Sequence, residues 1–180
     1  MRPIVAAVCF AGLSLLASPS FADSHETEES AYARSGYFVG LGGGFAHFLG
    51  DEESSGEITT RLGYREPRFA GAITSSYVTE GEAEGDETSL WTFGFDARGY
   101  AFTDWRYQPF ATIGFDLAGV RLGGDARSED REDLAVNVGV GVEPYLTEQF
   151  SVDLGIRYHY LLPADDFDYL TVRATLLYYF

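Results

Sequence analysis

The sequence predicts an all-β fold, specifically an eight-stranded antiparallel up-and-down transmembrane β-barrel. Three observations support this prediction. Eight segments, each of roughly ten residues, alternate apolar side chains with small or polar ones, which is the pattern of transmembrane strands. The links between these segments alternate between short and long. No run of 18 or more apolar residues is present, so a transmembrane helix is excluded and strands are the remaining way to span a bilayer.

The first four predicted strands each place bulky apolar side chains on one face. Residues 36–48 oppose Tyr, Val, Leu and Phe to a face made mostly of glycine, and residues 57–65 oppose Ile, Thr, Leu and Tyr to Thr, Arg and Gly. Residues 68–78 oppose Phe, Ile and Tyr to small residues, whereas residues 89–102 oppose Trp and Phe to Thr, Gly, Asp, Arg and Tyr. This period of two fits strands whose two faces meet different surroundings.

The last four predicted strands repeat the pattern. Residues 107–120 begin with Pro109 near the strand start, where proline is tolerated. Residues 134–146 alternate Leu and Val with Ala, Asn, Gly and Glu. Residues 150–160 alternate Phe, Val, Leu, Ile and Tyr with Ser, Asp, Gly, Arg and His, and residues 169–180 alternate apolar side chains with Thr and Arg. An even count of eight fits the smallest membrane barrels.

The links between the strands differ in length and charge. Short turns face the periplasm in such barrels and longer loops face outside, so both termini are expected on the periplasmic side. The formal net charge is −16, and most of the 28 acidic residues fall in or beside the long links, with none on the apolar face of a strand. The predicted short turns are residues 66–67, 103–106 and 147–149, and the predicted long links are residues 51–56, 80–88, 121–133 and 163–168.

The N-terminus has the three parts of a secretory signal peptide: Arg2, an apolar stretch over residues 4–17, and a small-residue end. Cys9 lies inside this segment, so the mature chain would contain no cysteine, which excludes disulfides and thiol chemistry. The expected organisation is a signal peptide at residues 1–22, a flexible acidic leader at residues 23–35, and a barrel domain at residues 36–180.

A soluble, lipocalin-like barrel is the structural alternative, because it too has eight alternating strands, with the apolar face inside. Its outer face should carry many charges. Here the polar face is mostly Gly, Ala, Ser, Thr and Asn, and the apolar face carries aromatic residues near the strand ends. Both features favour a membrane barrel with a narrow polar interior.

On this register several charged side chains face the interior, where they must be paired or solvated. We therefore predict a network of arginines and carboxylates that joins strands across the lumen. Its simplest role is structural, and the alternative is a gated narrow pore in which the pairs exchange partners. The predicted lumen network comprises Arg61, Arg65, Asp96, Arg98, Asp116, Glu143, Asp153, Arg157, His159 and Arg173.

These features together resemble the small outer-membrane barrel superfamily, which includes the outer membrane protein A transmembrane domain and the opacity-type adhesins. The terminal strand, with Tyr178 and Phe180 on its apolar face, resembles the signal that the outer-membrane insertion machinery reads. The resemblance covers about residues 36–180. It implies a porin-like protein in the outer membrane of a Gram-negative bacterium, in contact with lipid, lipopolysaccharide and that machinery.

The expected function is non-enzymatic: a structural or surface-interaction role through acidic extracellular loops. The alternatives are a narrow channel for ions or small solutes and a lipid A-modifying enzyme. His159, which faces inward, has no Ser two residues away along the strand, and neither has His47. No catalytic residue is therefore assigned. No cofactor or dedicated metal site is expected, although the acidic links could bind divalent cations diffusely. The negative exterior argues against nucleic acid as a partner.

Overall fold

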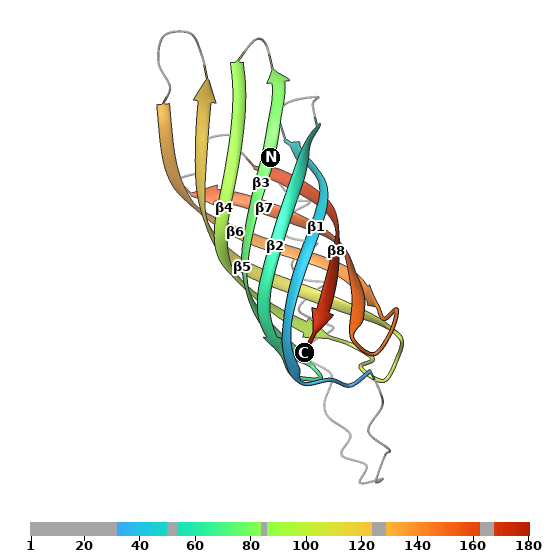
Figure 1. The fold of residues 1–180 in the computed structure, drawn as a ribbon. Coiled ribbons are helices and arrows are strands. Elements are labelled where there is room, and N and C mark those ends of the chain that lie inside the picture. Colours follow the sequence, from blue (N-terminus) through green and yellow to red (C-terminus); the bar gives the residue numbers. More distant parts are fainter. Residues whose placement is uncertain (1–31, 50–53, 84–85, 124–128, 163–167) are drawn as a thin grey trace.

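A computed structural model describes residues 32–49, 54–83, 86–123, 129–162 and 168–180, and these residues form a closed eight-stranded barrel (Figure 1). The predicted signal peptide and most of the predicted leader lie outside the described residues. Among the described residues, no helix is long and apolar enough to cross a bilayer. The strands are β1 (Gly36–Phe48), β2 (Ser54–Arg65), β3 (Phe69–Ala83), β4 (Asp86–Tyr100), β5 (Tyr107–Gly123), β6 (Glu129–Pro144), β7 (Phe150–Leu162) and β8 (Tyr169–Tyr179).

Every strand pairs antiparallel with the next one in the chain, and β8 returns to pair with β1. The closing register sets Phe38 opposite Tyr179 and Gly42 opposite Thr175. Since the barrel is closed, the membrane-spanning strands leave no free edge. The predicted fold class, an eight-stranded antiparallel up-and-down barrel, is confirmed.

The predicted strand ends lie within two residues of the observed ends at the short turns, whereas several predicted strands are too short at the loop end. Five strands run several residues further there than predicted, into segments expected to be links: β2 starts at Ser54, β3 reaches Ala83, β4 starts at Asp86, β5 reaches Gly123 and β6 starts at Glu129. The apolar alternation ends where the surroundings change from lipid to water, whereas backbone pairing continues past that boundary. Strand ends defined by hydrophobicity are therefore too short at this end.

At one short turn the prediction overran the strand. β4 ends at Tyr100, although residues 89–102 were expected to be extended. Phe102 has a φ of 54°, in the left-handed region that turns the chain, and its ring stacks on Trp105 with the centroids 4.7 Å apart. A bulky residue is uncommon in this conformation, so local alternation could not predict where the strand ends.

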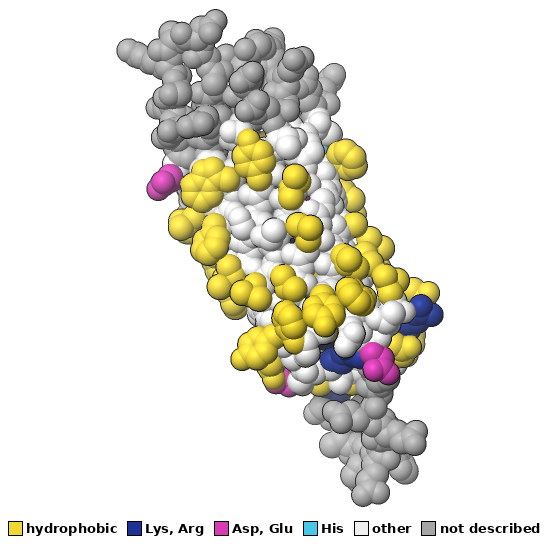
Figure 2. Space-filling view, viewed as in Figure 1, with side chains coloured by type: hydrophobic (Ala, Val, Ile, Leu, Met, Phe, Trp, Pro, Cys, Tyr) yellow, Lys and Arg dark blue, Asp and Glu magenta, His cyan; other side chains and the backbone are white. Residues whose placement is uncertain are grey.

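The outer wall of the barrel is apolar. Figure 2 shows hydrophobic side chains spread over it, with the visible charged side chains near the two ends. The side chains of Leu41, Phe45 and Phe93 are examples, 64%, 67% and 51% exposed, respectively. Apolar groups exposed over a whole wall are stable only against lipid. The apolar face therefore lies outside, opposite to a lipocalin-like barrel.

The lumen contains two apolar clusters, one near each end. We call the first the short-turn plug and the second the loop-end plug. The short-turn plug is Phe38, Ala70, Ala72, Tyr100, Phe110, Tyr145, Leu177 and Tyr179. The loop-end plug is Ala46, Val78, Leu90, Ala118, Ala135, Leu161 and Tyr169. All are buried, so apolar side chains fill the lumen on both sides of a polar middle.

Glycines make room for the polar middle. Gly94 is paired with Asp116, and Gly114 with Asp96. A Cβ atom at Gly94 would collide with the Asp116 carboxylate, and one at Gly114 with the Asp96 carboxylate and the Asn137 amide. On the lumen face, large charged side chains therefore lie next to glycines, which leave the space that these side chains need in a narrow barrel.

Candidate functional site

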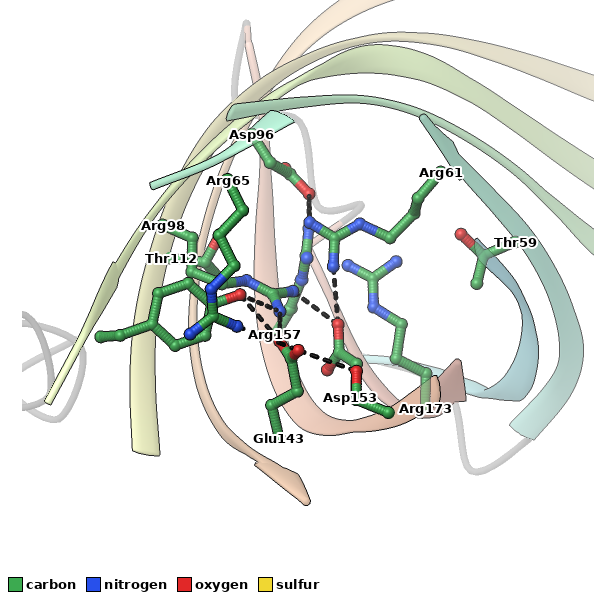
Figure 3. A network of polar contacts seen from close by, with 12 residues as sticks. Thr59, Arg61, Arg65, Asp96, Arg98, Thr112, Glu143, Asp153, Arg157 and Arg173 are labelled. Carbon is green, nitrogen blue, oxygen red and sulfur yellow. Dashed lines mark hydrogen bonds and ion pairs between the residues drawn. The ribbon is translucent and has the colours of Figure 1, made fainter. Parts of the chain in front are cut away.

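The structure places all ten residues of the predicted lumen network inside the barrel, where each is at most 5% exposed. They come from six strands, and the alternation of side chains along each strand turns them inward. Arg61 and Arg65 lie on β2, Asp96 and Arg98 on β4, Asp116 on β5, Glu143 on β6, Asp153, Arg157 and His159 on β7, and Arg173 on β8. Most of the network is drawn in Figure 3.

The half of the network nearer the short turns is organised around Glu143. Its carboxylate oxygens lie 3.0 Å from Arg65 Nη1 and 3.4 Å from Arg98 Nη1. The hydroxyls of Tyr100 and Tyr179 donate hydrogen bonds of 2.7 and 2.5 Å to the same carboxylate. With the hydroxyl of Ser151, one buried carboxylate thus receives two charged and three neutral donors, which offsets much of the cost of removing it from water.

The other half of the network alternates arginines with two aspartates. Asp153 Oδ2 accepts from Arg98 Nη2 at 2.5 Å and from Arg61 Nη1 at 2.6 Å. Asp96 Oδ2 lies 3.5 Å from Arg61 Nη2 and 2.5 Å from Arg157 Nη1. Figure 3 shows these side chains converging in the middle of the lumen. The result is an unbroken series of alternating charges, which we call the ionic ladder: Arg65, Glu143, Arg98, Asp153, Arg61, Asp96 and Arg157.

The lumen also contains a carboxylate that was not predicted there, because it was counted with the acids in or beside the long links. Glu57 is 3% exposed on β2, and its Oε1 lies 3.7 Å from Nη1 of Arg173. With Glu57, the described lumen residues include five arginines and five carboxylates, so their formal charges cancel. The alternation of side chains along β2 was the signal for this residue, because Glu57 shares a face with Thr59 and Arg61.

The neutral partners of the network were not predicted either. Ser151 donates a 2.8 Å hydrogen bond to Glu143, and the Asn137 amide donates one of 2.7 Å to Asp116. Gln108 contacts Arg65 through its amide oxygen. The strand alternation places these residues on the lumen face, but polar uncharged residues gave no separate signal. These three residues make hydrogen bonds to charged side chains of the network in addition to the ion pairs.

Two arginines also stack on aromatic rings of the short-turn plug. The guanidinium of Arg65 lies 3.7 Å from the ring centroid of Tyr100, and that of Arg98 lies 3.8 Å from the ring of Phe110. Both distances are within the range of cation–π attraction. These rings close one side of the ionic ladder and also stabilise its charges.

His159 lies beside the ladder, toward the loop end. Its ring stacks on Tyr169 at a centroid distance of 4.3 Å, with Nδ1 3.5 Å from Asp116 Oδ2. Its Nε2 lies 3.4 Å from the Thr171 hydroxyl. A carboxylate, an imidazole and a hydroxyl thus lie one next to the other. However, Thr171 is 0% exposed, and Tyr169 belongs to the loop-end plug. Because the hydroxyl is enclosed, no substrate can reach it in this structure, and the three side chains are part of the packed lumen.

On the outer wall the structure brings together one serine and one histidine that lie on neighbouring strands. His47 Nδ1 lies 3.3 Å from Ser54 Oγ across β1 and β2, and this contact is exposed. Spacing along one strand could not reveal this cross-strand pair. Among the residues that the structure describes, no group of three or more His, Cys, Asp or Glu could hold a metal ion.

The predicted insertion signal lies at the short-turn end of the wall. Phe180 is 71% exposed, and its backbone N–H donates a 3.0 Å hydrogen bond to the carbonyl of Tyr37. Its ring meets Tyr178 edge-on, with centroids 5.3 Å apart. The aromatic face of the terminal strand is thus turned outward, and its reading by the insertion machinery stays a prediction.

Comparison with known proteins identifies the family. Residues 8–180 match the model of the outer membrane protein beta-barrel domain. The fold resembles Neisserial surface protein A (18% identity, TM-score 0.69, covering 81% of this chain and 98% of that chain). It also resembles the N-terminal barrel of Pseudomonas aeruginosa OprF (13% identity, TM-score 0.63, covering 82% of this chain and 100% of that chain). A third similar structure is Ail, the attachment invasion locus protein of Yersinia pestis (15% identity, TM-score 0.55, covering 81% of this chain and 97% of that chain). A search of curated protein sequences finds no match.

The lumen geometry and the family agree. A closed barrel with an apolar wall and a polar, side-chain-filled interior is the architecture of these small membrane proteins. The chain belongs to the outer membrane protein β-barrel domain family, and it is a protein of the bacterial outer membrane.

Proposed function

We propose that this chain is a non-enzymatic outer-membrane barrel that interacts with partners through its acidic loop end, while its lumen is a structural core. The observation that carries the proposal is a sheet that extends past the rest of the barrel. Pairing of β3 with β4 continues to Ala83 and Asp86, and pairing of β5 with β6 continues to Leu122 and Glu129. Pairing between β6 and β7 ends at Leu134.

The two long hairpins also pair with each other, since β4 and β5 are in register as far as Glu87 and Gly123. We call the part of these four strands beyond the barrel wall the projecting sheet: residues 79–83, 86–89, 119–123 and 129–133. Figure 1 shows the two hairpins rising above the other strand ends. A paired sheet holds its residues in a fixed arrangement, which lowers the entropy lost when a partner binds.

The projecting sheet carries a large excess of negative charge. It has eight acidic residues and two basic ones: Glu80, Glu82, Asp86, Glu87, Glu129, Asp130, Glu132 and Asp133, with Arg121 and Arg131. Such a field attracts cationic partners and repels anionic ones. We therefore propose basic segments of surface proteins as the main partner class, with divalent cations bridging the sheet to lipopolysaccharide phosphates as a second mode.

Binding to a defined cationic probe tests this function. The barrel is placed in lipid vesicles and titrated with fluorescent polylysine, beside a variant in which short turns replace residues 80–87 and 121–132. The wild type is expected to bind with an affinity that falls as salt rises, and the shortened variant is expected to lose most of that binding. Equal binding by both barrels, with heat-modifiable gel mobility retained, would exclude the projecting sheet as the binding surface.

A narrow channel is the second candidate function. The ionic ladder supports it because Arg61 contacts both Asp96 and Asp153, so one arginine already shares two partners. Both plugs would have to move before an ion could pass. Single-channel recording of the refolded barrel tests this function, and we expect no steady conductance. Steady conductance that changes when Arg98 or Arg157 is replaced would establish the channel instead.

Lipid A modification is the third candidate. The fold alone does not decide it, since the similar outer membrane protein PagL is an enzyme. In this chain the two histidines to test are His159, enclosed in the lumen, and His47, which contacts Ser54 on the outer wall. Mass spectrometry of lipid A after expression is expected to show no change. A modification that is abolished by His159→Ala or His47→Ala would overturn the non-enzymatic proposal.

A further inference from the structure

The chain just before β1 crosses the short-turn mouth of the barrel, at the opposite end from the projecting sheet. Tyr32 is half-buried and packs against the short-turn plug, with its ring centroid 5.6 Å from that of Tyr145. The guanidinium of Arg34 lies 5.9 Å from the centre of the Tyr145 ring. Ser35 donates a 2.9 Å hydrogen bond to Glu66 in the turn between β2 and β3. Four consecutive residues, 32–35, therefore cover one side of the mouth.

This segment is connected to the ionic ladder through a single side chain. The amide nitrogen of Gln108 donates to the carbonyl of Tyr32 at 3.1 Å and to the carbonyl of Thr103 at 2.5 Å. The amide oxygen of Gln108 contacts Arg65, the ladder residue nearest this mouth. Gln108 is 0% exposed. The segment thus shields the first buried polar group between the mouth and the ladder.

The contacts that hold the segment differ from those that hold the barrel. Residues 32–35 are outside every strand, so no ladder of backbone hydrogen bonds fixes them. Their attachments to the wall include the half-buried ring of Tyr32, its backbone carbonyl, the Arg34 guanidinium over the Tyr145 ring and the exposed hydrogen bond of Ser35. A segment that is held by side chains and is not paired in a sheet opens at a smaller free-energy cost than paired strands. The segment can therefore leave while β1 to β8 remain closed.

We infer that residues 32–35 form a releasable seal over the short-turn mouth, and that Tyr32 is its main anchor. When the seal leaves, water reaches Gln108 and the Tyr145 ring, and the short-turn side of the lumen becomes accessible. The loop-end plug is built from residues at the opposite ends of the strands and stays closed. The lumen then becomes accessible from one side only, so release exposes the short-turn plug to water without making a continuous pore.

Thiol labelling at two depths of the lumen tests the seal. One reporter is Ala70→Cys in the short-turn plug, and the other is Ala135→Cys in the loop-end plug, each in a Cys9→Ser background. Both alanines are buried, at 8% and 0% exposure, and the substitution is small. The barrel in vesicles is treated with a membrane-impermeant maleimide, and the labelling rate is compared with and without Tyr32→Ala.

Tyr32→Ala is expected to raise labelling at position 70 by roughly tenfold and to leave position 135 unchanged, since only the local opening equilibrium shifts. Tyr32→Phe keeps the ring and should behave like the wild type. Tyr37→Ala is the matched control, because Tyr37 is a 65% exposed tyrosine of β1 on the outer wall. A variant lacking residues 32–34 should label at position 70 at least as fast as Tyr32→Ala.

Two outcomes would overturn the inference. A rise at both reporter positions would mean that the whole barrel is loosened, so the segment would be part of the core. No rise at position 70, in either Tyr32→Ala or the deletion variant, would mean that the short-turn plug closes the mouth without the segment. Heat-modifiable mobility of every variant shows that the barrel is folded during the measurement.

Discussion

The lumen and the projecting sheet contain the same types of charged residue in opposite arrangements. In the lumen five arginines meet five carboxylates, and all are nearly inaccessible to solvent. The sequence of the projecting sheet contains eight acidic residues and only two arginines. An uncompensated charge in a poorly solvated interior costs several kcal/mol, whereas water and salt screen a charge at the surface. Positive and negative charges must therefore balance in the lumen, whereas the projecting sheet can carry an excess of one sign.

The largest effect should come from removing a carboxylate that two arginines share. Asp153→Asn leaves Arg61 and Arg98 without their common charged partner. We expect a loss of about 3 to 5 kcal/mol in the free energy of unfolding, measured by urea titration in lipid vesicles. Glu132→Gln in the projecting sheet is the matched control, with a change within about 0.5 kcal/mol. Equal effects of the two substitutions would remove the distinction between the regions.

A smaller loss of stability is expected when a side chain is added at a lumen glycine. Gly94→Val would place new atoms against the Asp116 carboxylate. Overpacking of this kind costs about 1 to 3 kcal/mol, which the same urea titration would detect. A neutral result would show that the lumen has spare room at this level and that its charges are less tightly confined than the contacts indicate.

Glu57 tests whether balance itself matters. Glu57→Gln leaves Arg173 in excess, but the pair is long at 3.7 Å, so we expect a loss of about 1 to 3 kcal/mol. The double variant Glu57→Gln, Arg173→Met restores neutrality and should recover part of that loss. If the double variant is less stable than the sum of the single changes, local packing outweighs charge balance at this site.

The smallest effect on stability belongs to the projecting sheet, where binding is the sensitive measurement. Changing its eight acidic residues to Asn and Gln should alter the unfolding free energy by no more than about 0.5 kcal/mol per site, because none of them belongs to the ionic ladder. The same variant should lose the salt-dependent binding of polylysine. Retained binding would show that the backbone of the sheet, and not its charge, recruits the partner.

The sequence predicted which lumen residues face inward because strand alternation is a local property. It could not predict which arginine meets which carboxylate, since those contacts join strands far apart in the chain: Arg61 and Asp153 are separated by 92 positions. Glu57 was missed because it was grouped with the loop acids. The contact of His47 with Ser54 was missed because it depends on the register between β1 and β2.

The sequence by itself determined the strand count, the closed topology and the apolar wall, because a bilayer forces every strand to separate lipid-facing from lumen-facing side chains. The tertiary structure alone decided how far the strands continue beyond the membrane, how the lumen charges pair, and that residues 32–35 cover the short-turn mouth. These features depend on distances across the barrel, which are set only when its eight strands have closed.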